Sequence, residues 1–221
     1  MSFGKMANID EVQEMYTQRA SLYHNLFIDF LSYGRSLEAF FRKSNYLRSD
    51  LKILDAGCGS GILLRILYKL ALEKKLRGIT LHGFDLNKTM LNLFKQWMLE
   101  KDVRNIKLKQ ANVLKLETLP KDWKKYDLIV SSAMLEHLEK NKIKNALLQL
   151  KGRLKNNGIL LVFITKNNLL LRFFSFFWKG EWYGQKEIKQ ILEEVGFKRI
   201  RFKKFDHLLI NLWGHIIEAK K

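Results

Sequence analysis

The sequence has 221 residues, of which 47% are hydrophobic and 28% charged, and its formal net charge at pH 7 is +18. This length and composition suit one globular α/β domain and exclude a disordered chain. The single cysteine, Cys58, excludes an internal disulfide and a cysteine-cluster metal site.

Residues 10–45 carry apolar residues at helical spacing, and Gly34 is expected to separate two helices within this range. Tyr16, Arg19 and Tyr23 share one face of the first helix. We predict that residues 1–48 form a helical cover in which Tyr16 and Arg19 fold over a bound cofactor. The alternative is that this face packs against the core.

From residue 51 onward, short apolar runs alternate with longer amphipathic stretches. This alternation predicts a doubly wound, Rossmann-like α/β fold with a mostly parallel sheet and helices on both faces. The runs 197–205 and 207–219 follow each other too closely for a helical crossover, so they are expected to form an antiparallel C-terminal hairpin and complete a seven-stranded sheet. The other expected strands are 51–57, 79–86, 106–112, 126–132 and 158–164, and the expected helices are 60–75, 87–101, 140–155 and 185–195.

A glycine-rich loop follows the first strand of this sheet, in the stretch ILDAGCGSGILLRIL. Gly57, Gly59 and Gly61 are spaced G-x-G-x-G, one residue shorter than the G-x-G-x-x-G pattern of dinucleotide sites. Asp55 precedes them by two residues, and its carboxylate would repel a pyrophosphate but attract an ammonium group. The loop therefore favours a cationic ligand without a phosphate at the carboxyl edge of the sheet.

Two further polar residues end neighbouring strands. Asp85 ends the second strand, where a carboxylate can accept both hydroxyls of a ribose. Asn112 ends the third strand, and its amide can pair with an adenine edge while Ala111 and Val113 line the ring. A ligand that combines an ammonium group, a ribose and an adenine without a phosphate is S-adenosylmethionine.

Five motifs occur in order along residues 51–204: ILDAGCGSG, HGFDL, QANVLKL, YDLIVSSAMLEHL and LKNNGILLVF. Together they resemble the class I S-adenosylmethionine-dependent methyltransferases, and most nearly the small-molecule branch that includes quinone- and lipid-methylating enzymes. The resemblance implies S-adenosyl-L-methionine as the cofactor. It implies that Asp55 and the three glycines hold the methionine part, Asp85 the ribose, and Asn112 with Val113 the adenine.

The resemblance has one departure, because the family more often has Asp where Asn112 stands. The amide keeps an acceptor oxygen, so cofactor binding is expected to survive. Cys58, Leu86 and Ser131 are also expected to contact the cofactor, with Cys58 as a small packed residue rather than a nucleophile. The structural alternatives are that Gly57 serves only a tight turn, that Asp55 only caps a helix or binds backbone amides, and that Asp85 only caps the helix that begins near Asn87.

His137, just after the fourth strand, is the candidate catalytic base for an oxygen or carbon acceptor. The alternative is a histidine that packs or caps its own helix. Some relatives carry E-x-x-E-H as a metal site, but Ala133 stands at the first position here. We therefore predict no metal.

The stretch NNLLLRFFSFFWKGEWYG is more apolar than one helix face requires. We expect the whole chain to be one methyltransferase domain with a cover (1–48), a cofactor-binding core (51–165), an apolar insertion over the acceptor site (166–184) and a C-terminal helix with the strand hairpin (185–221). The insertion is interpreted as an acceptor pocket, an interfacial segment on a membrane or a core helix.

The expected acceptor is a hydrophobic small molecule or lipid-like compound. Residues 51–221 carry 34 basic and 16 acidic residues, scattered without long blocks. This excess is interpreted as a solvated surface or as attraction to RNA, an anionic membrane or an acidic partner. An RNA methyltransferase, a protein methyltransferase and a non-catalytic S-adenosylmethionine-binding protein therefore remain alternatives. With no apolar signal segment and no stretch long enough to span a bilayer, the chain is expected to be soluble and cytoplasmic.

Overall fold

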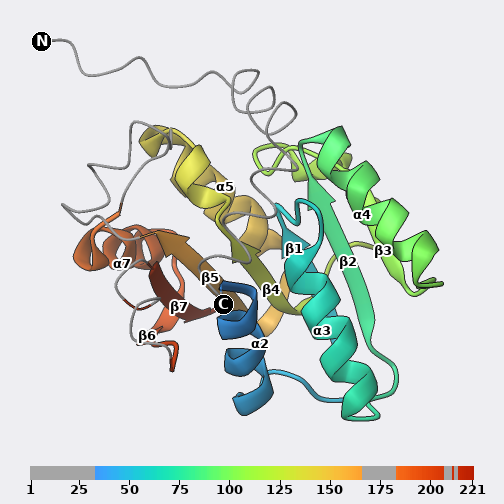
Figure 1. Cartoon of the computed structure of the whole chain (residues 1–221). Coiled ribbons are helices and arrows are strands. Elements are labelled where there is room, and N and C mark those ends of the chain that lie inside the picture. Colours follow the sequence, from blue (N-terminus) through green and yellow to red (C-terminus); the bar gives the residue numbers. More distant parts are fainter. Residues whose placement is uncertain (1–32, 166–182, 207–210, 212–213) are drawn as a thin grey trace, which may run out of the picture.

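The computed structural model describes residues 33–165, 183–206, 211 and 214–221 (Figure 1). Its strands are β1 (Lys52–Ala56), β2 (Thr80–Asp85), β3 (Ile106–Gln110), β4 (Tyr126–Ser132), β5 (Leu154–Thr165), β6 (Lys198–Lys203) and β7 (Gly214–Lys220). They form one seven-stranded sheet in the order β3-β2-β1-β4-β5-β7-β6. The first five strands are parallel, and β7 is antiparallel to both β5 and β6. The predicted mostly parallel sheet with an antiparallel C-terminal hairpin is confirmed.

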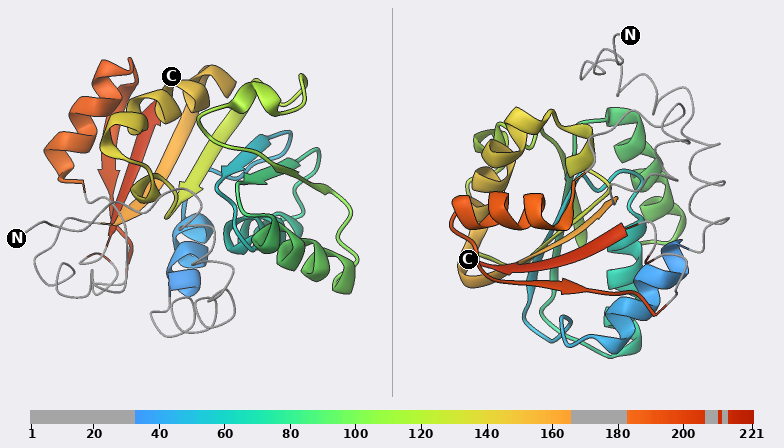
Figure 2. Two further views of the ribbon diagram at one scale, coloured as in Figure 1. Left: turned by 90° about the horizontal axis from the view of Figure 1, so that it is seen from above. Right: turned by 90° about the vertical axis from the view of Figure 1, so that its left-hand side faces the viewer.

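Helices occupy both faces of this sheet, as Figure 2 shows in the left view. They are α2 (Tyr33–Lys43), α3 (Ile62–Glu73), α4 (Lys88–Glu100), α5 (Lys140–Arg153) and α7 (Gln185–Glu194), with two short 3-10 turns, η1 (Leu116–Thr118) and η2 (Leu135–His137). The first of the two helices expected before residue 45 lies outside the described residues. Gly34, the predicted break between two helices, is the second residue of α2, so it does not interrupt the helix that the structure describes.

One strand boundary differs from the expected one. Strand β5 begins at Leu154, directly after α5, and Leu154 pairs with Tyr126 across an irregularity in the ladder. Strand β7 begins at Gly214, and residues 207–210, 212 and 213 of the expected last strand lie outside the described residues. In the connection between β6 and β7, the Asn211 side chain accepts a hydrogen bond from the Phe205 backbone N–H (2.7 Å) and donates to the Phe205 carbonyl (2.5 Å).

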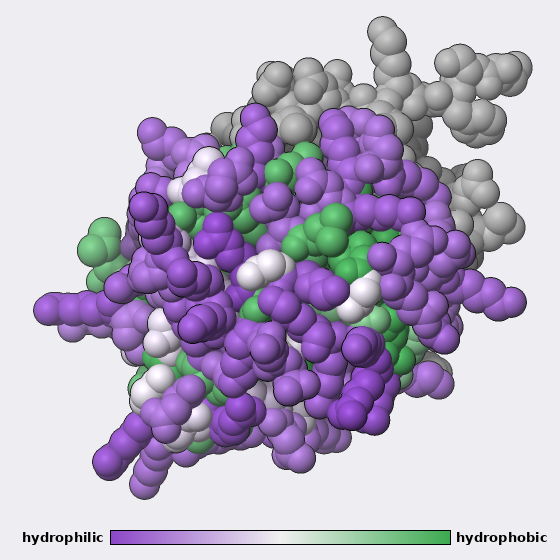
Figure 3. All heavy atoms as spheres, turned by 180° about the vertical axis from the view of Figure 1, so that it is seen from behind, coloured by the Kyte–Doolittle hydropathy of each residue, from purple (hydrophilic) through white to green (hydrophobic). Residues whose placement is uncertain are grey.

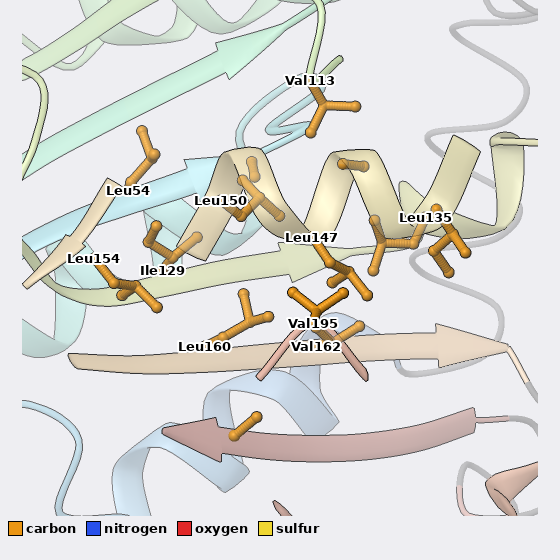
Figure 4. Close-up of a cluster of buried hydrophobic side chains, with 14 of the residues drawn as sticks. Leu54, Val113, Ile129, Leu135, Leu147, Leu150, Leu154, Leu160, Val162 and Val195 are labelled. Atoms are coloured by element: carbon orange, nitrogen blue, oxygen red, sulfur yellow. The ribbon is translucent and has the colours of Figure 1, made fainter. Parts of the chain in front are cut away.

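The alternation of side chains along the strands builds two hydrophobic clusters, one on each face. Ile53 packs with α2, α3 and α4, whereas the adjacent Leu54 packs with α5 and α7. Figure 4 shows the second cluster, in which Leu147 and Leu150 of α5 lie against the sheet. This burial on both faces explains why the strands read as continuous apolar runs rather than as alternating ones.

The order of the strands fixes where a ligand site can form. Strand β1 lies between β2 and β4, so the winding of the sheet reverses beside it. The loops that leave the carboxyl ends of β1, β2, β3 and β4 therefore meet at one edge, which is the usual ligand crevice of doubly wound folds. We call this the carboxyl edge.

The predicted cover residues Tyr16 and Arg19, and residues 166–182 of the apolar insertion, lie outside the described residues. The next residue, Tyr183, is fully buried and packs into the cluster of α5 and α7. In the described part of the chain, no helix combines the length and the apolar character needed to cross a membrane.

Candidate cofactor and acceptor site

The loop after β1 requires glycine for steric reasons. Gly57 (φ +73°) and Gly61 (φ +91°) are left-handed, a conformation that side chains disfavour. A Cβ atom on Gly57 would lie 2.3 Å from Cγ of Met134, and one on Gly61 would lie 2.4 Å from the ring of Phe94. The loop is therefore packed between α4 and the segment that follows β4, with its backbone at the carboxyl edge.

Asp55 lies at the centre of this edge and is only 1% exposed. Neither of its carboxylate oxygens has a hydrogen-bond partner among the described residues. Burial, and secondarily the charge of Asp85, raises the pKa of Asp55 well above its usual range. A buried carboxylate without a partner is costly unless a cation neutralises it. This group therefore fits the ammonium end of a cofactor such as S-adenosylmethionine.

Asp85, at the end of β2, is oriented by two backbone hydrogen bonds. One oxygen accepts the N–H of Gly59 at 2.7 Å, and the other accepts the N–H of Asn87 at 2.8 Å. Burial raises the pKa of Asp85, and the hydrogen bonds from Asn87 and Gly59 oppose this effect. Each carboxylate oxygen has a further lone pair, so Asp85 can hold two ribose hydroxyls while it anchors the glycine loop.

Asn112 lies beside Asp85, because the Ala111 N–H donates to the Asp85 carbonyl at 3.0 Å. The side-chain oxygen of Asn112 accepts the N–H of Leu114 at 2.9 Å, which fixes the turn after β3. The expected acceptor oxygen is thus already engaged by the backbone, although a second lone pair remains. Val113 is buried in the cluster of α5 and α7 (Figure 4).

The remaining predicted cofactor residues differ in exposure. Leu86 is partly exposed, whereas Cys58 and Ser131 are buried. The Cys58 side chain packs in the cluster of α2, α3 and α4, and burial raises the pKa of its thiol. Cys58 therefore stays a neutral thiol, as expected of a packing residue rather than a nucleophile. The Ser131 hydroxyl has no hydrogen-bond partner within the described residues.

The segment after β4 turns sharply toward the glycine loop. Ala133 is left-handed (φ +52°), and its N–H donates to the carbonyl of Phe163 at 3.0 Å. Such a conformation in a residue with a side chain is typical of functional turns. The η2 turn follows, with Glu136 2% exposed and His137 partly buried. The predicted base thus lies directly beyond the carboxyl end of β4.

Tyr33 is a residue of this edge that the sequence analysis missed. Its hydroxyl lies 2.7 Å from Oγ of Ser132. Burial raises the pKa of Tyr33 above its usual range, and the charges of Glu136 and Asp55 act in the same direction. Helical spacing alone gave Tyr33 no special role, because only folding brings α2 against the end of β4.

No group of three His, Cys, Asp or Glu side chains within residues 33–165, 183–206, 211 and 214–221 could hold a metal ion.

Residues 53–158 match the family model of a methyltransferase domain. Together with the strand order and the glycine loop after β1, this match bears out the resemblance to the class I S-adenosylmethionine-dependent methyltransferases that the ordered motifs indicate. 

One of two curated relatives is named as a methyltransferase. The chain is 31% identical over 120 residues to an uncharacterized protein of Rickettsia prowazekii, a match that covers 53% of this chain and 43% of that protein. It is 28% identical over 164 residues to the ubiquinone/menaquinone biosynthesis C-methyltransferase of Campylobacter jejuni, covering 71% of this chain and 64% of that enzyme. The chain thus matches less than two thirds of the length of either curated relative.

Solved structures show the same fold. Magnesium protoporphyrin IX methyltransferase from Synechocystis PCC 6803, with bound SAH, aligns with a TM-score of 0.62 at 18% identity. The alignment covers 100% of this chain and 90% of that protein.

Replacing Gly61 by alanine tests whether the glycine loop is sterically required. Gly61→Ala is expected to lower the free energy of unfolding by roughly 2–4 kcal/mol, since a left-handed alanine and a contact with Phe94 are both unfavourable. Gly152→Ala in α5 is the matched control, because its Cβ meets nothing within 4 Å, and it should stabilise by up to about 1 kcal/mol. Urea denaturation measures both. Equal effects would show that the loop tolerates a side chain.

Replacing Asp55 by asparagine tests whether its buried carboxylate, which has no partner among the described residues, destabilises the ligand-free protein. Since burial raises the pKa of Asp55 in the folded state, the native protein holds this proton to higher pH than the unfolded chain. Its contribution to stability therefore falls as the pH rises from about 3.9 through the folded-state pKa. Ligand-free Asp55→Asn is expected to lack this loss of stability with rising pH. Its melting temperature at neutral pH should therefore be higher than that of the wild type.

The same variant should lose most of the rise in melting temperature that S-adenosylmethionine gives the wild type. Asp102→Asn, whose side chain is 77% exposed, is the matched control and should behave like the wild type in both measurements. If the melting temperatures of Asp55→Asn and the wild type depended on pH in the same way, Asp55 would not be a buried carboxylate that waits for a cation.

Proposed function

We propose that this chain is an enzyme that transfers the methyl group of S-adenosylmethionine to an oxygen, nitrogen or carbon atom of a hydrophobic small-molecule or lipid-like acceptor. The observation that carries the proposal is Asp55, a carboxylate buried without a hydrogen-bond partner among the described residues, beside left-handed glycines and Asp85. This arrangement matches a cationic, phosphate-free cofactor. It does not match a dinucleotide, whose pyrophosphate Asp55 would repel.

The residues that would hold the cofactor follow from their chemistry. Asp55 would neutralise its ammonium group, Asp85 would accept the ribose hydroxyls, and Asn112 would face the adenine edge, with Leu86 beside it. We expect Tyr16 and Arg19 of the N-terminal segment to cover this site. S-adenosylmethionine supplies a methyl group already activated on a sulfonium, so the protein must mainly align the acceptor and exclude water.

His137 is proposed as the base that removes a proton from an oxygen or carbon acceptor. It follows the left-handed turn at Ala133, which directs the chain from the end of β4 toward the glycine loop. An amine acceptor would not need such a base once its own proton is lost. The role of His137 therefore distinguishes acceptor types.

The hydrophobic acceptor is supported by the relative in Campylobacter jejuni, which is named as a methyltransferase of ubiquinone and menaquinone biosynthesis. It is also supported by the composition of residues 166–184, which we propose to lie over the acceptor.

The alternative acceptor is RNA, which the net charge of +18 favours. One face of the molecule is largely hydrophilic with small separate hydrophobic patches (Figure 3). Several of the basic side chains in the described residues are paired with acids, as Lys155 is with Asp127 and Lys140 with Glu187. These local pairs favour a solvated, lysine-rich surface over a dedicated RNA site.

Transfer from methyl-labelled S-adenosylmethionine to a cell extract tests the proposed function. Label is expected in the organic-solvent-soluble fraction, and Asp85→Ala should abolish it because the ribose loses a charged acceptor. Asp206→Ala, whose side chain is 60% exposed, is the matched control and should retain full transfer. Label in RNA or protein would overturn the proposed acceptor, and cofactor binding without any transfer would identify a non-catalytic binding protein.

Replacing His137 by alanine tests the proposed base. With an oxygen or carbon acceptor, the rate of transfer at saturating cofactor should fall by about 10²-fold or more, while S-adenosylhomocysteine affinity stays unchanged. Single-turnover rates and calorimetric titration measure the two quantities. A full rate in His137→Ala would make His137 a structural residue or indicate an amine acceptor.

A further inference from the structure

The hydrogen-bonded hydroxyls of Tyr33 and Ser132 lie near the carboxylate of Asp55, which has no hydrogen-bond partner among the described residues. Asp55 of β1 pairs in register with Val130 of β4, and Ser132 follows Val130 by two residues. Side chains two residues apart on a strand share a face, so Ser132 lies on the same face as Asp55 and about 6–7 Å further toward the carboxyl edge. Tyr33 reaches Ser132 from the first residue of α2.

The acidic residues around this pair would attract the ammonium group of an amino-acid ligand and repel its carboxylate. Asp55 and Asp85 are acidic, and Glu136 is close enough to Tyr33 to raise the pKa of its phenol. An ammonium group is stabilised there, but the carboxylate of the same amino acid would be repelled. It therefore needs hydrogen-bond donors that carry no negative charge.

We propose that Ser132, oriented by Tyr33, donates a hydrogen bond to the amino-acid carboxylate of the cofactor, while Asp55 neutralises the ammonium group of the same moiety. This inference rests on the proposed function, since it assigns the second half of the binding site for the methionine tail. When the Tyr33 hydroxyl donates to Ser132, the partly exposed Ser132 keeps its own O–H for the ligand.

Both hydroxyls of this pair carry a proton at physiological pH. The pKa of a phenol is ordinarily about 10, and burial with the nearby acids raises that of Tyr33 further. Tyr33 is thus a positioning residue, and Ser132 is the residue that contacts the ligand. The left-handed turn at Ala133 ends β4 directly after Ser132, so the Ser132 hydroxyl lies at the carboxyl edge.

Two ligands separate this role from a general effect on the fold. S-adenosylhomocysteine carries the amino-acid tail, whereas 5′-methylthioadenosine keeps the adenosine and the thioether but lacks the tail. Ser132→Ala and Tyr33→Phe are each expected to weaken binding of S-adenosylhomocysteine by about tenfold or more, as for one lost hydrogen bond to a charged group. Neither variant should change the affinity for 5′-methylthioadenosine. Isothermal titration calorimetry with the full chain measures all four affinities.

Tyr46→Phe is the matched control. Tyr46 also loses a side-chain hydrogen bond, to Glu218, but this bond joins the connection after α2 to β7 rather than to the site. Its affinity for both ligands should equal that of the wild type, and thermal melting of each variant checks the fold.

Loss of affinity for both ligands alike in Ser132→Ala, or loss for neither, would overturn the inference. A wild-type chain that binds 5′-methylthioadenosine as tightly as S-adenosylhomocysteine would also overturn it, because no group would then recognise the tail. A wild-type chain that binds neither ligand would instead refute the proposed function itself.

Discussion

The site depends on one electrostatic constraint, a carboxylate held out of water without a hydrogen-bond partner among the described residues. Asp55 occupies the end of the central strand β1, where both faces of the sheet are covered and solvent cannot stabilise its charge. In the proposed site, binding of a cation would remove the cost of this arrangement and so give the edge affinity for an ammonium group. The same carboxylate would disfavour phosphates, which fits an adenosyl sulfonium better than a dinucleotide.

The other residues of the edge act around this constraint. Asp85 uses its carboxylate to bind the glycine loop backbone while it remains able to accept ribose hydroxyls. The segment after β4 is held close by a left-handed turn and by Met134, whose side chain occupies the space that any residue other than glycine at position 57 would need. The glycine loop thus contacts both the core and the proposed site. Substitutions in this loop are expected to affect stability and cofactor binding together.

The class and the overall arrangement could be predicted because they depend on local patterns. The alternation of apolar runs with amphipathic stretches corresponds to the sheet and its two helical layers, and the acid before G-x-G-x-G distinguishes the loop from dinucleotide sites. Strand boundaries that depend on tertiary contacts could not be predicted from the sequence. Strand β5 extends back to Leu154 because β4 is there to pair with it. The acceptor itself also lies beyond local patterns, since an activated methyl group requires no distinctive catalytic set.

The sequence by itself determined the class of domain, the position of the glycine loop and the order of its acidic residues, because strand ends and turns are encoded by neighbouring residues. Only the tertiary structure decided that the Asn112 oxygen closes a turn and that Tyr33 meets Ser132 across 99 positions of the chain. These relations depend on which side chains face one another after the sheet is assembled. Helical or strand periodicity describes the faces of single elements, and it carries no information about the partner that each face will meet.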